Sequence, residues 1–177
     1  MSVEPIGPSN PRGTIELREI LHNSPAYGLA VALRTAVLRQ PLGLAFSSDQ
    51  LQSEVHAYHL GAFLETQLLA CLMLQPMEGG TIRMRQVAVQ TEWQGQGLGR
   101  RLVNHAETVA RQRGFQVMTL HARESAVGFY QRLGYSEVGP GFVELTLPHW
   151  AMHKPLVRCD ERLCTCTEAP SPAQPNM

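Results

Sequence analysis

A glycine-rich segment, Arg85 to Leu102, constrains the fold of this chain more than any other part of it. The segment has the pattern of a strand, a short turn, a glycine loop and the start of a helix. Gly95, Gly97 and Gly99 stand at alternate positions, so the backbone can take positive φ angles and approach a ligand without side chains in the way. The helix that follows would add unpaired N–H groups and the positive end of its dipole, which favours phosphate binding.

The charges that follow the loop agree with an anionic ligand. Arg100 and Arg101 lie in the first turn of the expected helix, where a cation is unfavourable by about 0.3 to 1 kcal/mol because it faces the positive end of the dipole. A bound anion would reverse the sign of that interaction. The segment therefore predicts a phosphate-binding loop.

The spacing of the glycines distinguishes between known kinds of phosphate loop. A P-loop needs a Lys and a Ser or Thr after its last glycine, and Arg100 and Arg101 stand there instead. A dinucleotide loop needs its third glycine one place later and an acidic residue about 20 positions on, but residues 115–120 carry no carboxylate. The remaining pattern is Gln/Arg-x-x-Gly-x-Gly, filled by Gln94, Gly97 and Gly99. It resembles the acyl-CoA pyrophosphate loop of the GNAT superfamily of N-acetyltransferases.

The resemblance extends beyond the loop and covers roughly residues 80 to 157. In that superfamily the loop follows the fourth strand, and a helix, a fifth strand and a helix ending in Tyr-x-x-x-Gly-Phe come next. Here residues 116–121 have the pattern of the strand, and Tyr130 and Gly134 fill the later motif. Residues 141–152 contain a Pro-His-x-x-Met segment similar to the ElaA-like branch. One departure is Arg123, because many relatives carry Asn about seven residues before the tyrosine.

The resemblance implies an α/β fold, with a mixed, mostly antiparallel, twisted sheet and helices on both faces. With 177 residues, 44% of them hydrophobic, the chain is long enough for one domain with a core. We expect a flexible lead at 1–13, a single acetyltransferase domain at 14–158 and a disordered tail at 159–177.

Periodicity in the first half of the chain predicts its elements. Residues 14–21 alternate apolar with charged side chains, as a strand with one exposed face does. Ser24 and Pro25 are expected to begin a helix that ends before Gln40. The predicted apolar stripe of this helix consists of Leu29, Leu33, Ala36 and Val37. The following loop, 41–50, has a flexible composition, and the resemblance implies that it forms one wall of the acceptor pocket.

The pattern of the second half predicts a hairpin followed by alternating strands and helices. Strands are expected at 55–64 and 67–75, joined by a two-residue connection, and at 81–89. A helix at 97–113 is predicted to bury an apolar stripe and to carry Glu107 and Arg111 as an ion pair outside it. The stripe consists of Leu98, Leu102, Val103, Ala106, Val109 and Ala110. A second helix is expected at 124–133.

The resemblance implies which residues bind the cosubstrate, acetyl-CoA. The fourth strand would offer backbone groups to the pantetheine arm, the loop would hold the pyrophosphate, and two residues near the second helix would complete the site. These predicted cofactor-binding residues are Gln86, Val87, Ala88, Val89, Gln94, Gly95, Gln96, Gly97, Leu98, Gly99, Arg100, Arg123 and Phe129.

Tyr130 is, by the same resemblance, the acid that meets the CoA thiolate. A tyrosine pKa of about 10 and an alkyl thiol pKa of about 8.5 make full proton transfer uphill by ~2 kcal/mol, so Tyr130 is also expected to act as a hydrogen-bond donor to sulfur. The base that deprotonates the amine is open among three residues. His149 is a candidate from the Pro-His-x-x-Met segment, Glu144 precedes it, and His121 ends the fifth strand.

Composition excludes several other classes. Fifteen basic and fifteen acidic residues give a formal charge of zero, which argues against nucleic acid or an anionic membrane as the main partner. The longest apolar run, 68–74, is too short to span a membrane, and the start has no secretory signal, so a cytoplasmic location is expected. His56 and His59 lie three apart on a predicted strand, hence on opposite faces, and Cys159, Cys164 and Cys166 lack zinc-site spacing. No metal is expected.

We therefore expect an N-acetyltransferase that moves an acetyl group from acetyl-CoA to a primary amine by direct attack in a ternary complex. The acceptor is expected to be a small molecule, and the protein to be a monomer or homodimer. Three alternatives remain: a non-catalytic acyl-CoA sensor, a protein N-acetyltransferase, and a nucleotide-binding protein, which the absent loop lysine disfavours.

Overall fold

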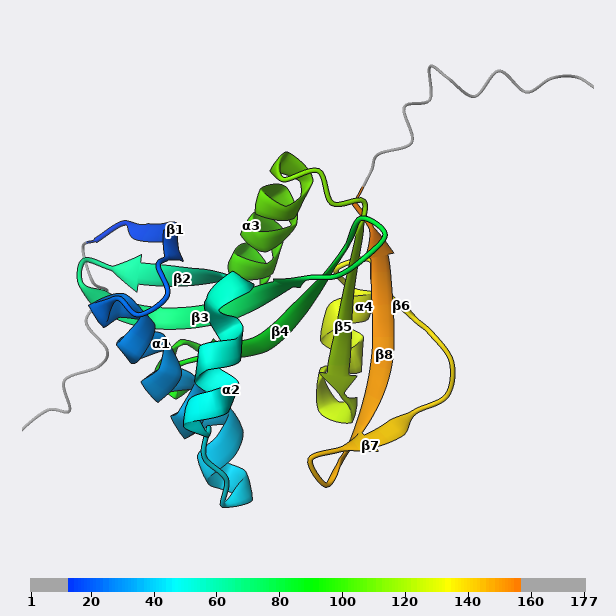
Figure 1. The fold of residues 1–177 in the computed structure, drawn as a ribbon, viewed down its shortest axis with the longest axis horizontal. Coiled ribbons are helices and arrows are strands. Elements are labelled where there is room, and N and C mark those ends of the chain that lie inside the picture. Colours follow the sequence, from blue (N-terminus) through cyan, green and yellow to red (C-terminus); the bar gives the residue numbers. More distant parts are fainter. Residues whose placement is uncertain (1–12, 157–177) are drawn as a thin grey trace, which may run out of the picture.

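The structure is a computed structural model that describes residues 13–156 (Figure 1). The predicted tail at 159–177 and nearly all of the predicted lead at 1–13 lie outside these residues, as do Cys159, Cys164 and Cys166. Among residues 13–156, the strands form one sheet, which belongs to the domain predicted at 14–158. No helix in this part of the chain combines the length and the apolar character that a membrane crossing requires.

The sheet is mixed and mostly antiparallel, as the resemblance implied. Its strand order is β1-β2-β3-β4-β5-β8-β6, with β7 paired to β8. β4 and β5 are parallel, and the other paired strands are antiparallel. The strands are β1 (Ile15–Ile20), β2 (Tyr58–Leu64), β3 (Gln67–Pro76), β4 (Thr81–Val89), β5 (Val117–Arg123), β6 (Ser136–Glu137), β7 (Phe142–Glu144) and β8 (Leu147–Pro155).

Helices cover both faces of the sheet (Figure 1). α1 (Pro25–Arg34) packs on β3 and β4 from one face, and α3 (Leu98–Gln112) packs on β2, β3 and β4 from the other. α4 (Val127–Gln131) packs on β5 and shares the core of α3. The short helix α2 (Ser48–Gln52) begins with a capping box, in which Ser47 and Gln50 bond each other's backbone.

Local patterns predicted most of the elements correctly. Ser24 caps α1 by accepting a hydrogen bond from the N–H of Tyr27 at 3.2 Å, and Glu65 and Thr66 connect β2 to β3. Every member of the predicted stripe of α3 is buried, and the stripe forms much of the larger core cluster. This core fixes α3, and therefore the loop before it, against the sheet.

Four local predictions are wrong, and tertiary packing explains two of them. Leu29 is 48% exposed, because α1 buries Tyr27, Ala30 and Arg34 instead. Glu107 is buried rather than outside, because Lys154 of β8 binds its carboxylate at 2.7 and 2.8 Å.

The other two corrections concern element boundaries. Val55 and His56 belong to a 3-10 turn, Ser53–His56, so β2 begins only at Tyr58 and the two histidines do not share a strand. The helix expected at 124–133 is a 3-10 turn, Glu124–Ala126, followed by the shorter α4. Residues 41–50 are also less irregular than expected, since Gln40–Leu42 forms a 3-10 turn and α2 begins at Ser48. The chain from 53 to 56 brings Glu54 beside α1.

Candidate active site

An opening between two neighbouring strands forms the centre of the candidate site. β4 and β5 pair from Thr81 and Val117 as far as Met84 and Leu120. Beyond these residues β5 continues beside β8, while β4 follows β3 and turns away (Figure 1). The diverging ends, residues 85–87 and 121–123, line one cavity.

A bulge in β4 lies at this opening. Cys71 pairs with Ala88 and Met73 pairs with Arg85, so two residues of β4 stand opposite the single residue Leu72. One of the two, Gln86, has a φ of 54°, which a residue other than glycine rarely adopts. Such bulges bend a strand and redirect its backbone groups. The backbone of β4 is therefore irregular where it faces the opening.

The glycine loop follows β4 and opens into α3. Gly95 and Gly97 have φ values of 74° and 79°, and Gly97 is the N-cap residue of α3. The side chain of Gln94 donates a hydrogen bond to the carbonyl of Val89 at 3.0 Å, which ties the loop to the end of the strand. No side chain caps the N-terminus of α3, so the N–H groups of its first turn stay available for a ligand.

Two cavities lie at the opening. The loop cavity adjoins the glycine loop and is lined, among others, by Val87, Val89, Gln94, Gly95, Gly97, Gly99, Arg100, Phe129 and Tyr130. The sheet cavity lies over the exposed face of β4 and β5 and includes Arg83, Arg85, Gln86, His121, Arg123, Tyr130, Glu144 and His149. Val87, Ala126 and Tyr130 line both cavities. The two spaces therefore meet at the bulge and at Tyr130.

Tyr130 is held rigidly where the cavities meet. It is 8% exposed, and its ring packs edge-on against Phe129 and Tyr135. Burial raises the pKa of Tyr130 well above its usual value of 10. Its hydroxyl group is therefore protonated throughout the neutral range and can donate a hydrogen bond into either cavity.

The three candidate bases share the sheet cavity with Tyr130. Nδ1 of His121 lies 2.7 Å from Oε2 of Glu144, and Nδ1 of His149 lies 2.9 Å from the carbonyl oxygen of Leu147. Because a carbonyl oxygen only accepts, Nδ1 of His149 carries the proton and its Nε2 keeps a free lone pair when the ring is neutral. The ring of Phe142 packs against both histidines.

The carboxylate of Glu144 is charged at neutral pH. Partial burial would raise its pKa, but the hydrogen bond from His121 and the nearby positive charges bring the pKa below its usual value. Glu144 therefore orients His121 through Nδ1 and leaves Nε2 of that ring available. Two histidines are thus arranged to accept a proton.

A buried ion pair that sequence patterns did not predict supports the bulge. Arg34 of α1, which is 1% exposed, binds both carboxylate oxygens of Glu54, at 3.0 and 2.9 Å. Tyr27 donates to the same carboxylate at 2.7 Å, and Nη1 of Arg34 also donates to the side-chain oxygen of Gln86. The spacing of Tyr27, Ala30 and Arg34 along α1 could have placed Arg34 on the buried face, but nothing in the sequence indicates Glu54 as its partner.

Acidification is expected to lower the free energy of unfolding in two steps, one from Glu54 and one from His59, whose Nε2 lies 3.3 Å from the carbonyl oxygen of Glu54. Burial lowers the pKa of His59 below its usual 6.5, so the unfolded chain takes up a proton that the folded protein does not. The corresponding stability is present above pH 6.5 and is lost as the pH falls below it, by at most about 1.4 kcal/mol per pH unit.

Glu54 supplies the second step. Burial raises its pKa, but the hydrogen bonds from Arg34 and Tyr27 outweigh this effect and hold the pKa below its usual value. Its contribution is present above about pH 4.3 and is lost as the pH falls through the lowered pKa. Urea unfolding from pH 8 to about pH 2 measures both steps, and His59→Gln should remove the first. A free energy that stays constant between pH 7 and pH 5 would contradict the assignment to His59.

The sequence profile of the Acetyltransferase (GNAT) family matches residues 17–135, a range that includes the glycine loop, the opening and Tyr130. The chain belongs to this family. The uncharacterized protein YyaT of Bacillus subtilis is 31% identical over 80 residues, which are 45% of this chain and 54% of that protein. The chain spans about half the length of the curated relatives it matches.

Solved structures of GNAT proteins share the fold. A candidate N-acetyltransferase from Lactobacillus plantarum is 29% identical, with a TM-score of 0.69 over 80% of this chain and 99% of its own. Escherichia coli ElaA, at 19% identity, has a TM-score of 0.68 with the same coverage. An aminoglycoside 6'-N-acetyltransferase in complex with coenzyme A is 16% identical, with a TM-score of 0.68 over 81% of this chain and 98% of its own. At these low identities, the similarity to the last two structures shows a common fold and nothing more.

The predicted GNAT site residues fall into two groups. Tyr130, Glu144 and His149 line the sheet cavity together with Gln86 and Arg123, and most of the predicted cofactor residues line the loop cavity. The side chains of Ala88 and Leu98 are buried in the core, so only their backbone could contact a ligand. Gln96 donates to the carbonyl of Glu92 at 2.6 Å, and Arg123 donates to that of Leu38 at 3.1 Å.

Proposed function

We propose that this chain transfers an acetyl group from acetyl-CoA to the primary amine of a small molecule, by direct attack in a ternary complex. The observation that carries the proposal is the meeting of two cavities at Val87 and Tyr130. A cosubstrate in the loop cavity and an amine in the sheet cavity would bring their reacting atoms together there, as direct transfer requires.

The loop cavity suits acetyl-CoA in its shape and in its donors. The N–H groups of the loop and of the first turn of α3 would bind the pyrophosphate, with Arg100 at its edge. Val87 and Val89 line the same cavity, so the backbone of β4 past its last pairing with β5 would bind the pantetheine arm. This arrangement would place the thioester beside the bulge.

The reaction would form one C–N bond and break one C–S bond. The neutral amine attacks the thioester carbonyl, an N–H of β4 near Val87 or Val89 stabilises the oxyanion, and the CoA thiolate leaves. The nitrogen then releases one proton to give the amide, and this proton balances the charge of the thiolate. The hydroxyl of Tyr130 would donate a hydrogen bond to that thiolate. Because burial raises the pKa of Tyr130, complete proton transfer to sulfur is more than ~2 kcal/mol uphill, and hydrogen bonding is the favoured role.

The ammonium group of the acceptor would lose its proton to a histidine of the sheet cavity. At pH 7 this deprotonation costs ~1 kcal/mol for an α-amine of pKa about 7.7, and ~4.6 kcal/mol for a lysine of pKa about 10.4. His149, with a free Nε2, and His121, oriented by Glu144, are both arranged for this task. Weak bases of this kind favour an amine of low pKa.

Gly97→Ala is expected to weaken acetyl-CoA binding about tenfold. A Cβ at a φ of 79° is unfavourable by roughly 1 to 2 kcal/mol, and relief of this strain would move the amide groups that bind the pyrophosphate. Titration calorimetry with CoA measures the change. Gly114→Ala is the matched control. Gly114 also has a positive φ, 83°, and an added Cβ would meet open space, but this glycine follows the C-terminal end of α3, far along the helix from the loop.

The two glycine variants distinguish a binding effect from a folding effect. Both should lower stability by similar amounts, and only Gly97→Ala should raise the Kd for CoA. Equal Kd values in the two variants, or an unchanged Kd in Gly97→Ala, would mean that the loop does not hold the pyrophosphate.

A further inference from the structure

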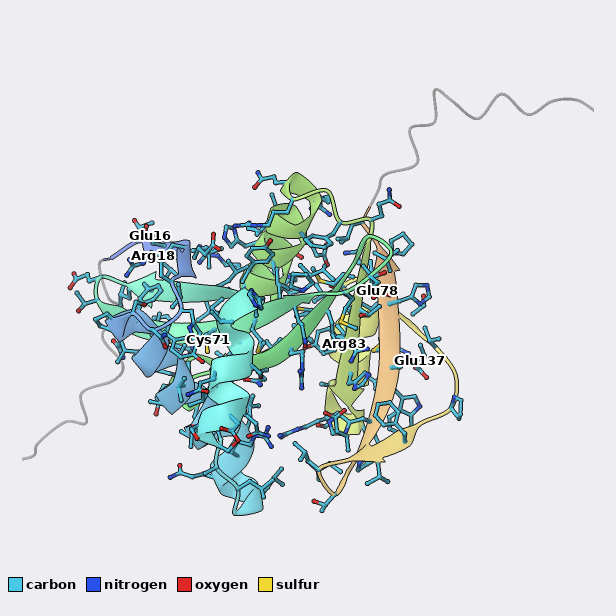
Figure 2. All side chains as sticks on the ribbon, viewed as in Figure 1. Glu16, Arg18, Cys71, Glu78, Arg83 and Glu137 are labelled. Atoms are coloured by element: carbon cyan, nitrogen blue, oxygen red, sulfur yellow. The ribbon has the colours of Figure 1, made fainter. Side chains whose placement is uncertain are left out.

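Four arginines converge on the sheet cavity. Arg83 and Arg85 alternate on β4 and therefore leave the same face of the sheet, Arg123 ends β5, and Arg39 ends the π-helical turn Thr35–Arg39. Figure 2 labels Arg83 where β4 lies next to β5, and its register partner there is Thr119, so it stands just before the strands diverge. The chain as a whole has no net charge, so this local excess of positive charge is a property of the cavity.

These arginines have no carboxylate partner among residues 13–156, where the ion pairs are formed by other side chains. Arg85 donates to the neutral side chain of Gln75 at 3.0 Å, and Arg39 stacks on the ring of Phe46 at 4.5 Å. Nε of Arg83 is buried without any hydrogen-bond partner. Nε of Arg34 is also unpartnered, but other nitrogens of that guanidinium bind Glu54 and Gln86. Buried guanidinium donors are normally satisfied, so Arg83, which has no carboxylate partner of this kind, can receive a ligand group.

The single carboxylate that lines the cavity, Glu144, offsets only part of the charge of the four arginines. Glu144 is bonded to His121 at 2.7 Å, and Glu54 on the neighbouring side is bound by Arg34 and Tyr27. The arginines also repel one another: the pKa of Arg39 is lowered by burial and by the charge of Arg85, Glu144 offsets part of this effect, and Arg123 adds to it. An anion placed among them would relieve this repulsion.

We infer that the sheet cavity binds an acceptor whose amine is joined to an anionic group, a carboxylate or a phosphate, and that Arg83, Arg85, Arg39 and Arg123 receive that group. The inference rests on the proposed transfer to an amine and names its substrate class. Guanidinium groups bind both anions through paired N–H donors. The same positive charge disfavours a polyamine, whose second ammonium would enter the cavity.

The register of the sheet adds a limit on the size of the acceptor. Arg123 of β5 pairs with His149 of β8, so their side chains leave the same face as neighbours. The anion-binding arginines and the candidate base therefore line one small cavity with Tyr130. A short spacer between the amine and the anionic group fits this arrangement better than a long chain.

Binding of matched amines to the CoA-loaded protein tests the inference without relying on turnover. Titration calorimetry would compare glycine with glycinamide, 4-aminobutyrate with 4-aminobutanamide, and O-phosphoethanolamine with ethanolamine. The pairs separate carboxylate from phosphate recognition. In at least one pair the anionic member is expected to bind about ten- to a hundredfold more tightly, the usual range for a charged hydrogen-bonded group.

Variants assign the preference to the arginines. Arg85→Gln should remove most of it, Arg85→Lys should keep much of it, and Arg83→Gln should add to the loss. Arg111→Gln is the control, because Arg111 is an exposed arginine of α3 whose partners are Thr108 and Glu107. Equal or absent binding of both members in all three pairs overturns the inference, and so does a preference that survives loss of both Arg83 and Arg85.

A parallel thiol-release assay distinguishes failure of the inference from failure of the proposed function. Release of CoA with neutral amines and no preference for anionic ones would overturn the anion site and keep the transferase. Tight, arginine-dependent binding of an anionic amine without any release would keep the site and overturn the transfer.

Discussion

Tyr130→Phe is expected to lower kcat about a hundredfold and to leave the KM for acetyl-CoA nearly unchanged. The change removes only the hydroxyl group at the junction of the cavities, while the ring keeps its packing against Phe129 and Tyr135. Donors that act on a leaving group contribute roughly 10²- to 10⁴-fold, and the lower end applies because hydrogen bonding, rather than full proton transfer, is the favoured role. Steady-state kinetics with acetyl-CoA and a saturating amine measures the loss.

Tyr135→Phe is the matched control for this experiment. Tyr135 is also a buried tyrosine, but its hydroxyl lies 3.0 Å from the sulfur of Met118 in the core. Its loss should reduce stability slightly and leave kcat within a few-fold of the parent. A Tyr130→Phe variant that retains kcat within about threefold would remove Tyr130 from the mechanism.

Arg34→Met is expected to lower the free energy of unfolding by about 3 to 5 kcal/mol, because it leaves the buried carboxylate of Glu54 without its cation. For a chain of this size the melting temperature should fall by roughly 10 °C. Denaturant unfolding at neutral pH measures the change. The double variant Arg34→Met with Glu54→Leu should recover much of the stability, since replacing both partners removes the unpaired charge.

An exposed ion pair in the same fold provides the comparison. Arg113 and Glu19 lie 2.7 Å apart, but both side chains are partly exposed, and exposed pairs contribute about 1 kcal/mol or less. Arg113→Met should therefore be far milder than Arg34→Met. If the two variants lose the same stability, or if the double variant is no better than Arg34→Met, the buried pair does not have the role described for it.

The parts of the fold that sequence predicted are those in which neighbours along the chain decide the structure. The glycine loop, the cap at Ser24 and the turn at Glu65 depend on residues within a few positions of one another. The stripe of α3 repeats over four turns, so its period alone identifies the buried face. These features were enough to find the loop and its helix.

The remaining features depend on partners far apart in the sequence. Arg34 and Glu54 are 20 residues apart, and Glu107 and Lys154 are 47 apart, so neither contact leaves a local pattern. A prediction from apolar periodicity assumes that the buried face of a helix carries only apolar side chains. It therefore places Leu29 on the buried face of α1, although the charged Arg34 is buried and Leu29 is exposed. The bulge at Gln86 arises from pairing with β3 and has no glycine to indicate it.

The candidate active site also combines features that local patterns indicate with features that only the folded chain brings together. Motifs indicate Tyr130 and His149, and Glu144 is a candidate only from its place five residues before His149. The topology brings the three to one cavity because β4, β5, β7 and β8 meet there. The arginines of that cavity come from three separate segments and gave no signal as a group. The anionic acceptor that we infer rests on their convergence in the folded chain.

The most direct test of the acetyltransferase assignment is a measurement of free CoA thiol from acetyl-CoA, with and without amines, together with the mass of the amine product. The panel should contain α-amino acids, their amides, short amino acids and a polyamine. The account predicts amine-dependent release with one acetyl group added to the amine for each thiol formed, and loss of this release in Tyr130→Phe. Tight binding of CoA with no release above the buffer rate for any amine, and no acetylated product, would contradict it.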